Sequence, residues 1–173
     1  RTKARLAAVA DINGVAAAHA ARKYKAGKAV SDYREILSDP AIQAVFVLVG
    51  HHLHAKFVCE CLEAGKHVFV EKPLAINEGQ LNGVRSLKLA FADSENAAAS
   101  PKSKNANFKD LTPNAPMVMV GFNRRFSPHT VKIRELLAGR TEPLTMNMTV
   151  NAGFIPPEHW TQDPERGGGR IIG

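Results

Sequence analysis

The chain has 173 residues and a net charge of +7, with 45% hydrophobic and 23% charged residues. These proportions are typical of a globular protein, and no apolar run approaches the roughly 20 residues that a membrane span needs. Aromatic residues make up only 6% and the basic residues are scattered, so the charge favours a small anionic ligand over nucleic acid.

The two cysteines, Cys59 and Cys61, stand two positions apart in a predicted helix, where such residues point to different faces. This spacing disfavours a disulfide between them and favours two small buried side chains in a reducing compartment. The stretch from Arg1 to Arg5 leads into no signal-peptide pattern. We therefore expect a cytoplasmic protein.

Short strands and helices alternate from the start of the chain. A strand is predicted over 6–10, and Asn13 can cap the helix that follows it. Regular alternation with short connections predicts an α/β fold with a doubly wound parallel sheet. The further expected elements are a strand over 28–30, a helix between Asp32 and Pro40, a strand over 44–49, a helix over 52–64 capped by Gly65, a strand over 68–70 covered on both faces and a helix over 77–91.

The composition changes after residue 91. Residues 92–116 are rich in Ser, Asn, Lys, Ala and Pro, which predicts an exposed polar insertion. A strand over 117–120 and a helix over 127–138 follow, and the apolar alternation over 144–150 predicts a half-exposed antiparallel strand. This change in strand character predicts a first domain over 1–122 and the start of an α+β domain over 123–173.

The sequence Glu71-Lys72-Pro73 comes directly after the predicted strand over 68–70. Ligands of open α/β sheets bind beyond the carboxyl ends of strands, and unpaired buried charges are costly, so this pair is expected to face a cleft. Pro73 restricts the backbone of Lys72 to extended geometry and thereby directs its side chain. The alternative is a structural ion pair between Glu71 and Lys72 in an ordinary loop.

Three histidines, His51, His52 and His54, follow the strand over 44–49. A zinc site needs further ligands in a defined tetrahedral set. We therefore predict no metal site at this turn.

Four segments together resemble the glucose–fructose oxidoreductase/inositol dehydrogenase (Gfo/Idh/MocA) family. They are Asp11, the turn over 49–54, the stretch from Gly65 to Pro73, and the Gly-Phe-Asn-Arg-Arg-Phe sequence over 121–126. The segment over 160–170 is in addition similar to the family's entry into its C-terminal domain. The resemblance implies a Rossmann-like dinucleotide-binding domain, followed by an α+β domain that carries substrate contacts and the interfaces of a homo-oligomer. It also implies that the family's first strand, with its Gly-rich turn, and its catalytic Asp/His segment are absent here, so that this chain alone is inactive.

The resemblance implies an NAD-dependent oxidoreductase that transfers a hydride between nicotinamide and a sugar, cyclitol or related polyol. Lys72 is the implied catalytic residue, placed to share a proton with the substrate hydroxyl, and its side chain is expected to be partly buried. Asp11 would accept bonds from the adenosine ribose, which favours NAD over NADP; the alternative for Asp11 is a helix N-cap. The other implied cofactor contacts are Val49, Gly50, His51, His54, Glu71 and Pro73.

Substrate contacts are implied for Asn123, Arg124 and Arg125, since guanidinium groups suit polyhydroxylated or carboxylated ligands. A surface salt bridge is the alternative for the two arginines. For the protein as a whole, the alternative is a non-catalytic Rossmann-like binding or oligomerisation module with a decayed redox site.

Overall fold

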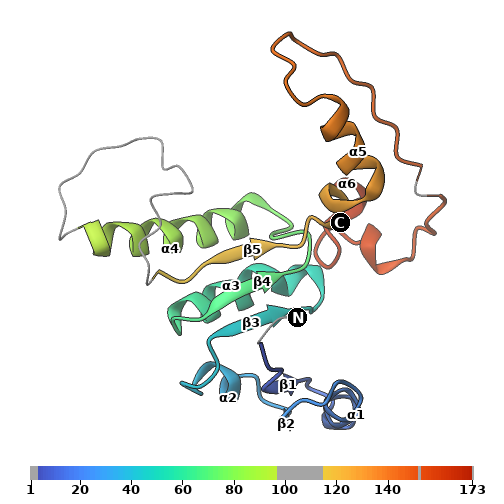
Figure 1. The fold of residues 1–173 in the computed structure, drawn as a ribbon. Helices are drawn as coiled ribbons and strands as arrows, with labels where there is room; N and C mark the ends of the chain where they lie inside the picture. The colour runs from blue at the N-terminus through green and yellow to red at the C-terminus, as the bar shows by residue number, and fades with distance from the viewer. Residues whose placement is uncertain (1–3, 97–114, 152, 173) are drawn as a thin grey trace.

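A computed structural model describes residues 4–96, 115–151 and 153–172 (Figure 1). Its strands form two sheets, β1-β2 and β3-β4-β5, and every pair of neighbouring strands is parallel. The parallel pairing with intervening helices confirms the predicted α/β class. The strands are β1 (Ala8–Ala10), β2 (Lys28–Val30), β3 (Ala44–Val47), β4 (His67–Val70) and β5 (Val118–Val120).

The N-terminal unit comprises β1, β2 and the helices α1 (Gly14–Tyr24) and α2 (Arg34–Leu37). The side-chain oxygen of Asn13 accepts hydrogen bonds from the amides of Val15 at 3.0 Å and Ala16 at 3.3 Å, which confirms the predicted cap. The buried face of α1 carries only the small side chains of Ala17 and Ala21.

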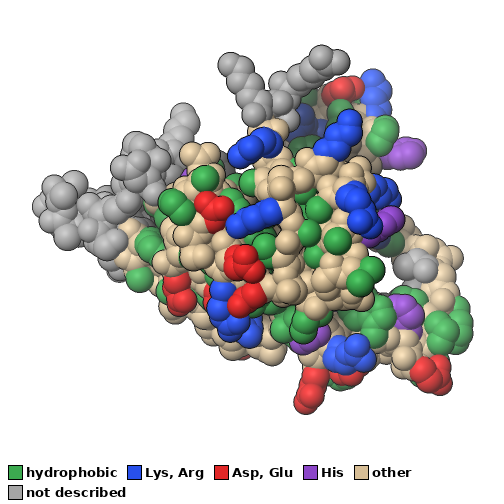
Figure 2. All heavy atoms as spheres, turned by 90° about the horizontal axis from the view of Figure 1, so that it is seen from below, with side chains coloured by type: hydrophobic (Ala, Val, Ile, Leu, Met, Phe, Trp, Pro, Cys, Tyr) green, Lys and Arg blue, Asp and Glu red, His purple; other side chains and the backbone are tan. Residues whose placement is uncertain are grey.

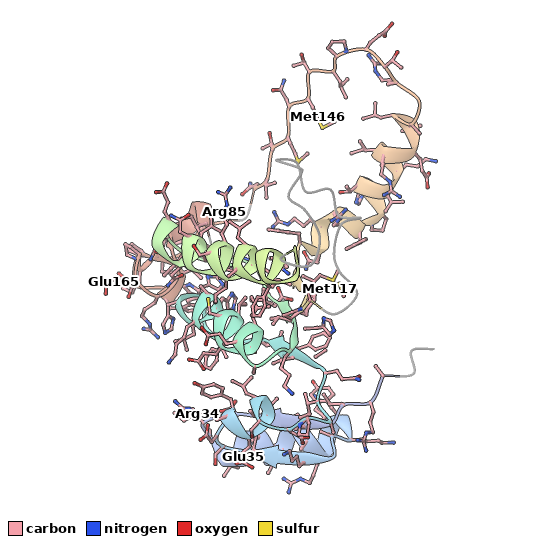
Figure 3. All side chains as sticks on the ribbon, turned by 90° about the vertical axis from the view of Figure 1, so that its left-hand side faces the viewer. Arg34, Glu35, Arg85, Met117, Met146 and Glu165 are labelled. Carbon is pink, nitrogen blue, oxygen red and sulfur yellow. The ribbon has the colours of Figure 1, made fainter. Side chains whose placement is uncertain are left out.

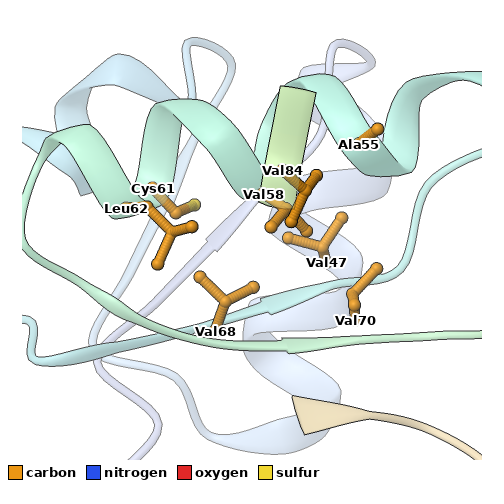
Figure 4. Packing of buried hydrophobic residues seen from close by; sticks show 8 residues of the cluster. All are labelled: Val47, Ala55, Val58, Cys61, Leu62, Val68, Val70 and Val84. Atoms are coloured by element: carbon orange, nitrogen blue, oxygen red, sulfur yellow. The ribbon is translucent and has the colours of Figure 1, made fainter. Parts of the chain in front are cut away.

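The central unit comprises β3, β4 and β5 with α3 (His54–Glu63) and α4 (Glu78–Asn96). Figure 4 shows side chains of α3 packed onto β3 and β4, and Val58, Leu62 and Val70 are completely buried there. The full cluster of buried residues is Val47, Ala55, Val58, Cys61, Leu62, Val68, Val70 and Val84.

Only one face of the central sheet is covered by helices of the described residues. On the other face Phe46 is 65% exposed and stacks at a tilt on Phe69, with ring centroids 5.1 Å apart. The prediction that the strand over 68–70 is covered on both faces is therefore wrong. An uninterrupted apolar run such as Val68 to Val70 does not distinguish a strand buried on one face from one buried on both.

The two units are joined around Asp39. The buried Lys66, which directly precedes β4, donates from its ammonium to the Asp39 carbonyl oxygen at 2.7 Å. The Asp39 carboxylate lies 3.5 Å from the ammonium of Lys28 in β2. The rings of Tyr33 and Phe57 also pack edge to face, with centroids 4.6 Å apart.

Helix α4 continues to Asn96, so the predicted insertion over 92–116 does not begin where the helix was expected to end at Phe91. The composition of residues 92–96 alone does not distinguish the end of a helix from a loop. Most of that insertion, over 97–114, lies outside the described residues.

The chain after β5 contains a short 3₁₀ turn and helix α5 (Pro128–Leu136), whose first turn is capped by Ser127. An extended segment that includes Met146 then runs opposite α5 (Figure 3). The predicted strand over 144–150 is wrong, because this segment pairs with no strand among the described residues. Its apolar alternation predicts an extended backbone but does not provide a hydrogen-bonding neighbour. The last element is α6 (Gly169–Ile172).

No helix of the described residues is long and apolar enough to cross a bilayer. On the face shown in Figure 2, Lys and Arg side chains are interspersed with acidic and apolar ones rather than gathered into one basic patch. The predicted boundary between residues 122 and 123 stays a prediction.

Candidate functional site

A pocket of about 320 Å³ lies at the carboxyl ends of β3 and β4. Its wall combines the exit of β3, the 3₁₀ turn η1 (His51–Leu53) that leads into α3, the exit of β4 and the 3₁₀ turn η3 (Trp160–Gln162). The lining residues are Leu48, Val49, Gly50, His51, His54, Glu71, Lys72 and Trp160. The structure thus brings together six of the residues proposed from the sequence.

Lys72 lines this pocket but its side chain is exposed, so the expected partial burial is wrong for this chain. Within the described part of the chain its ammonium forms no ion pair, and only its backbone amide contacts Glu71, at 3.3 Å from Oε2. The alternative of a structural Glu71–Lys72 ion pair is therefore not what the structure shows. Pro73, which follows through a cis peptide bond, is buried.

His51 and His54 form a buried corner of the pocket. Nδ1 of His51 lies 2.9 Å from the carbonyl oxygen of Gly167, and its ring contacts Trp160 with centroids 4.7 Å apart. His54 is 1% exposed, with Nδ1 at 2.6 Å from the carbonyl oxygen of Pro73 and Nε2 at 2.9 Å from that of Val49. Both nitrogens of His54 therefore face the protein backbone. The described residues contain no group of three potential metal ligands.

Glu71 sits beside a glycine that the sequence reasoning did not single out. A Cβ atom at Gly121 would lie 3.2 Å from Oε2 of Glu71 and 3.0 Å from Cζ of Phe69. Gly121 also donates from its amide to the carbonyl oxygen of Val70 at 2.8 Å, which keeps β5 in register with β4. The absent side chain thus leaves space for the carboxylate at the edge of the pocket.

Trp160 and Leu48 are the lining residues that the sequence reasoning missed. Trp160 is the single tryptophan of the sequence, and it opens the segment over 160–170 that resembles the family. That resemblance could have marked the residue, but no sequence pattern placed it against His51, more than one hundred positions away.

The remaining predicted site residues lie outside the pocket. Asn123, Arg124 and Arg125 occupy the 3₁₀ turn η2 (Asn123–Phe126) that follows β5, and Arg125 lies over the ring of Phe126 at 5.3 Å from its centroid. Neither arginine forms a salt bridge with another described residue, so the surface salt-bridge alternative is not observed.

Asp11 follows β1 in the N-terminal unit, and its Oδ1 accepts a hydrogen bond from the amide of Asn13 at 2.8 Å. The N-cap of α1 is Asn13, so the alternative that Asp11 itself caps the helix is wrong. Its carboxylate is exposed, as a contact with a ribose would require.

The two cysteines take no part in this site, and both are free thiols. Cys61 is buried in the core of the central unit, and burial raises the pKa of its thiol to about 11. Burial also raises the pKa of the half-buried Cys59, with the carboxylates of Glu63 and Glu60 as lesser causes. Raised pKa values describe unreactive thiols.

Parallel strands covered by helices, with a pocket beyond the carboxyl ends of two neighbouring strands, define a nucleotide-binding protein of the Rossmann type. Residues 1–100 match the GFO_IDH_MocA family, described as an oxidoreductase family with an NAD-binding Rossmann fold. The chain therefore belongs to this family, which confirms the resemblance seen in the sequence.

Several relatives extend this similarity. The chain is 31% identical over 133 residues to the uncharacterized oxidoreductase YrbE of Bacillus subtilis, covering 77% of this chain and 32% of that protein. It is 31% identical over 157 residues to inositol 2-dehydrogenase 2 of Saccharopolyspora erythraea, covering 88% and 40%. A levoglucosan dehydrogenase structure in complex with NADH and L-sorbose matches with a TM-score of 0.56 at 28% identity, covering 79% of this chain and 31% of that one. The chain thus spans two fifths or less of these relatives.

Proposed function

We propose that the protein carrying this chain is an NAD-dependent dehydrogenase of a sugar, cyclitol or related polyol. The observation that carries the proposal is an exposed ammonium without an ion-pair partner among the described residues, at the pocket beyond β3 and β4. Inositol and levoglucosan dehydrogenases among the relatives support the substrate class.

The residues present fit a nicotinamide ring with a hydroxylated substrate beside it. Val49, Gly50 and Trp160 offer main-chain groups and an aromatic surface, while Glu71 and Lys72 offer an acceptor and a donor. Bound NAD would supply the hydride acceptor. Asp11, exposed at the end of β1, would accept hydrogen bonds from the ribose hydroxyls, and its charge would disfavour a 2′-phosphate.

In this proposal Lys72 would donate a hydrogen bond to the oxygen of the substrate hydroxyl and assist the transfer of the hydroxyl proton to a base elsewhere in the full-length protein, while the hydride would leave the carbon that bears this hydroxyl for bound NAD. Glu71 orients Lys72 or a ribose. The side chains of Asn123, Arg124 and Arg125, at the exit of β5, contact the more distant hydroxyls. Assembly as a homo-oligomer and a cytoplasmic location stay predictions.

The test uses the full-length protein. We expect NADH to bind, measured by nicotinamide fluorescence, and NAD to be reduced with at least one member of a panel of sugars and polyols. Lys72→Ala should lower kcat by about 10²–10⁴-fold while NADH still binds, because positioned proton transfer contributes roughly that factor. Lys132→Ala, which changes an exposed lysine of α5, is the matched control.

Two outcomes would contradict the proposal. NADH binding without turnover of any polyol would favour the non-catalytic module, and absence of NADH binding would remove the cofactor assignment. Tighter binding of NADPH than of NADH would contradict the role given to Asp11.

A further inference from the structure

His54 is a buried ring whose two nitrogens both face acceptors. It is 1% exposed, and its ring nitrogens lie 2.6 Å and 2.9 Å from the carbonyl oxygens of Pro73 and Val49. A carbonyl oxygen only accepts hydrogen bonds, whereas a neutral imidazole has one N–H donor and one nitrogen lone pair. A neutral ring would therefore set a lone pair against a carbonyl oxygen at one of these two short distances.

We propose that His54 is held as an imidazolium that donates to both carbonyl groups, and that it thereby positions Lys72. Two charge-assisted hydrogen bonds are the arrangement that satisfies both acceptors. A buried cation is costly unless it is fully hydrogen-bonded, and here each N–H has a carbonyl partner.

The two carbonyl groups come from the segments that follow the neighbouring strands β3 and β4. Val49 is the second residue after β3 and lines the pocket, while Pro73 is the third residue after β4 and directly follows Lys72. His54 is the first residue of α3 and lines the pocket from that helix, so it belongs to neither strand exit. Its ring therefore fixes the distance between the exits of the two strands, and so the place from which the Lys72 side chain starts.

The positioning role rests on the proposed function, whereas the double protonation does not. His54 does not need to touch substrate, since both of its nitrogens are used by the backbone. A displacement of about 1 Å at a catalytic group can cost on the order of 10²-fold in rate. We expect a loss of that size in kcat when the His54 ring no longer connects the carbonyl groups of Val49 and Pro73.

The first experiment is nitrogen NMR of the full-length protein labelled at histidine. At pH 7 we expect the His54 ring to show hydrogens on both nitrogens, with slow exchange against solvent. His54→Gln assigns the signal by its loss, and His19→Gln, at an exposed position of α1, is the matched control. A ring with one protonated and one lone-pair nitrogen would overturn the imidazolium.

The second experiment is a double-mutant cycle on turnover. His54→Gln should lower kcat by about 10²-fold in the otherwise unaltered protein and by little in the Lys72→Ala background, because the histidine acts through the lysine. An equal loss in both backgrounds would overturn the positioning role. His19→Gln should leave kcat unchanged.

These two measurements separate the inference from the proposed function. If the protein turned over no polyol, the proposed function and the positioning role would fail together, yet the NMR spectrum would still decide the protonation of the ring. If His54→Gln did not fold, contacts between the ring hydrogens and residues 49 and 73 would assign the signal in the unaltered protein. His54→Asn would then replace it in the cycle.

Discussion

The N-terminal and central units are both built from parallel strands joined through a helix, but they are packed very differently. In the central unit Val58 and Leu62 are completely buried, whereas α1 buries only alanines and Val15 at its start is 79% exposed. Stability from packing scales with the apolar surface that is buried. The same alternation of strands and helices therefore gives a well-packed core beneath the pocket in the central unit and a weakly packed core in the N-terminal unit.

The largest effect should come from the core of the central unit. Leu62→Ala removes a fully buried side chain, and we expect it to lower the free energy of unfolding by about 2–5 kcal/mol. Urea denaturation followed by circular dichroism measures this change. Leu89→Ala in α4, where the side chain is 55% exposed, is the control and should cost less than about 1 kcal/mol. Equal losses of unfolding free energy in Leu62→Ala and Leu89→Ala would contradict the idea that the buried core dominates the stability of the central unit.

A smaller effect is expected in the N-terminal unit. Asn13→Ala removes the cap of α1 and should cost about 1 kcal/mol, while Asn13→Ser should retain most of the stability because a hydroxyl can also cap. Hydrogen exchange should show faster exchange for amides of α1 and little change for those of α3. Equal acceleration in both helices would mean that the two units open together.

The smallest effect on stability concerns the Cys61 thiol, and it is expected at alkaline rather than neutral pH. Its pKa is raised to about 11 by burial, so between roughly pH 9 and 11 the folded protein keeps a proton that the unfolded chain releases. Stability should therefore fall as the pH rises through this range. Denaturation midpoints measured across it test the prediction, and in Cys61→Ala the slope should be shallower. An unchanged slope would assign the decline to other groups.

Local patterns allowed much of the fold to be predicted from the sequence. The Asn13 cap, the Gly65 helix end with its φ of 71° and the β4 strand depend on nearby residues, and the structure confirms them. The strand predicted over 144–150 failed because pairing needs a neighbour that local alternation does not specify.

The candidate site shows the same division between local and distant information. The sequence Glu71-Lys72 at a strand end was enough to predict residues that line a pocket. The contact of Trp160 with His51 and the two carbonyl partners of His54 depend on distant parts of the chain, so periodicity and composition carried no sign of them.

Under the proposed function, the junction at Asp39 also determines the spacing of two cofactor contacts. One residue receives Lys66 on its carbonyl group and Lys28 on its carboxylate, and it stands between the unit that carries Asp11 and the unit that carries Lys72. A dinucleotide that contacts both residues would span this junction, so the junction would set the distance between its two contact sites. Substitutions at the junction would then change the affinity for the dinucleotide even though they alter no atom that contacts it.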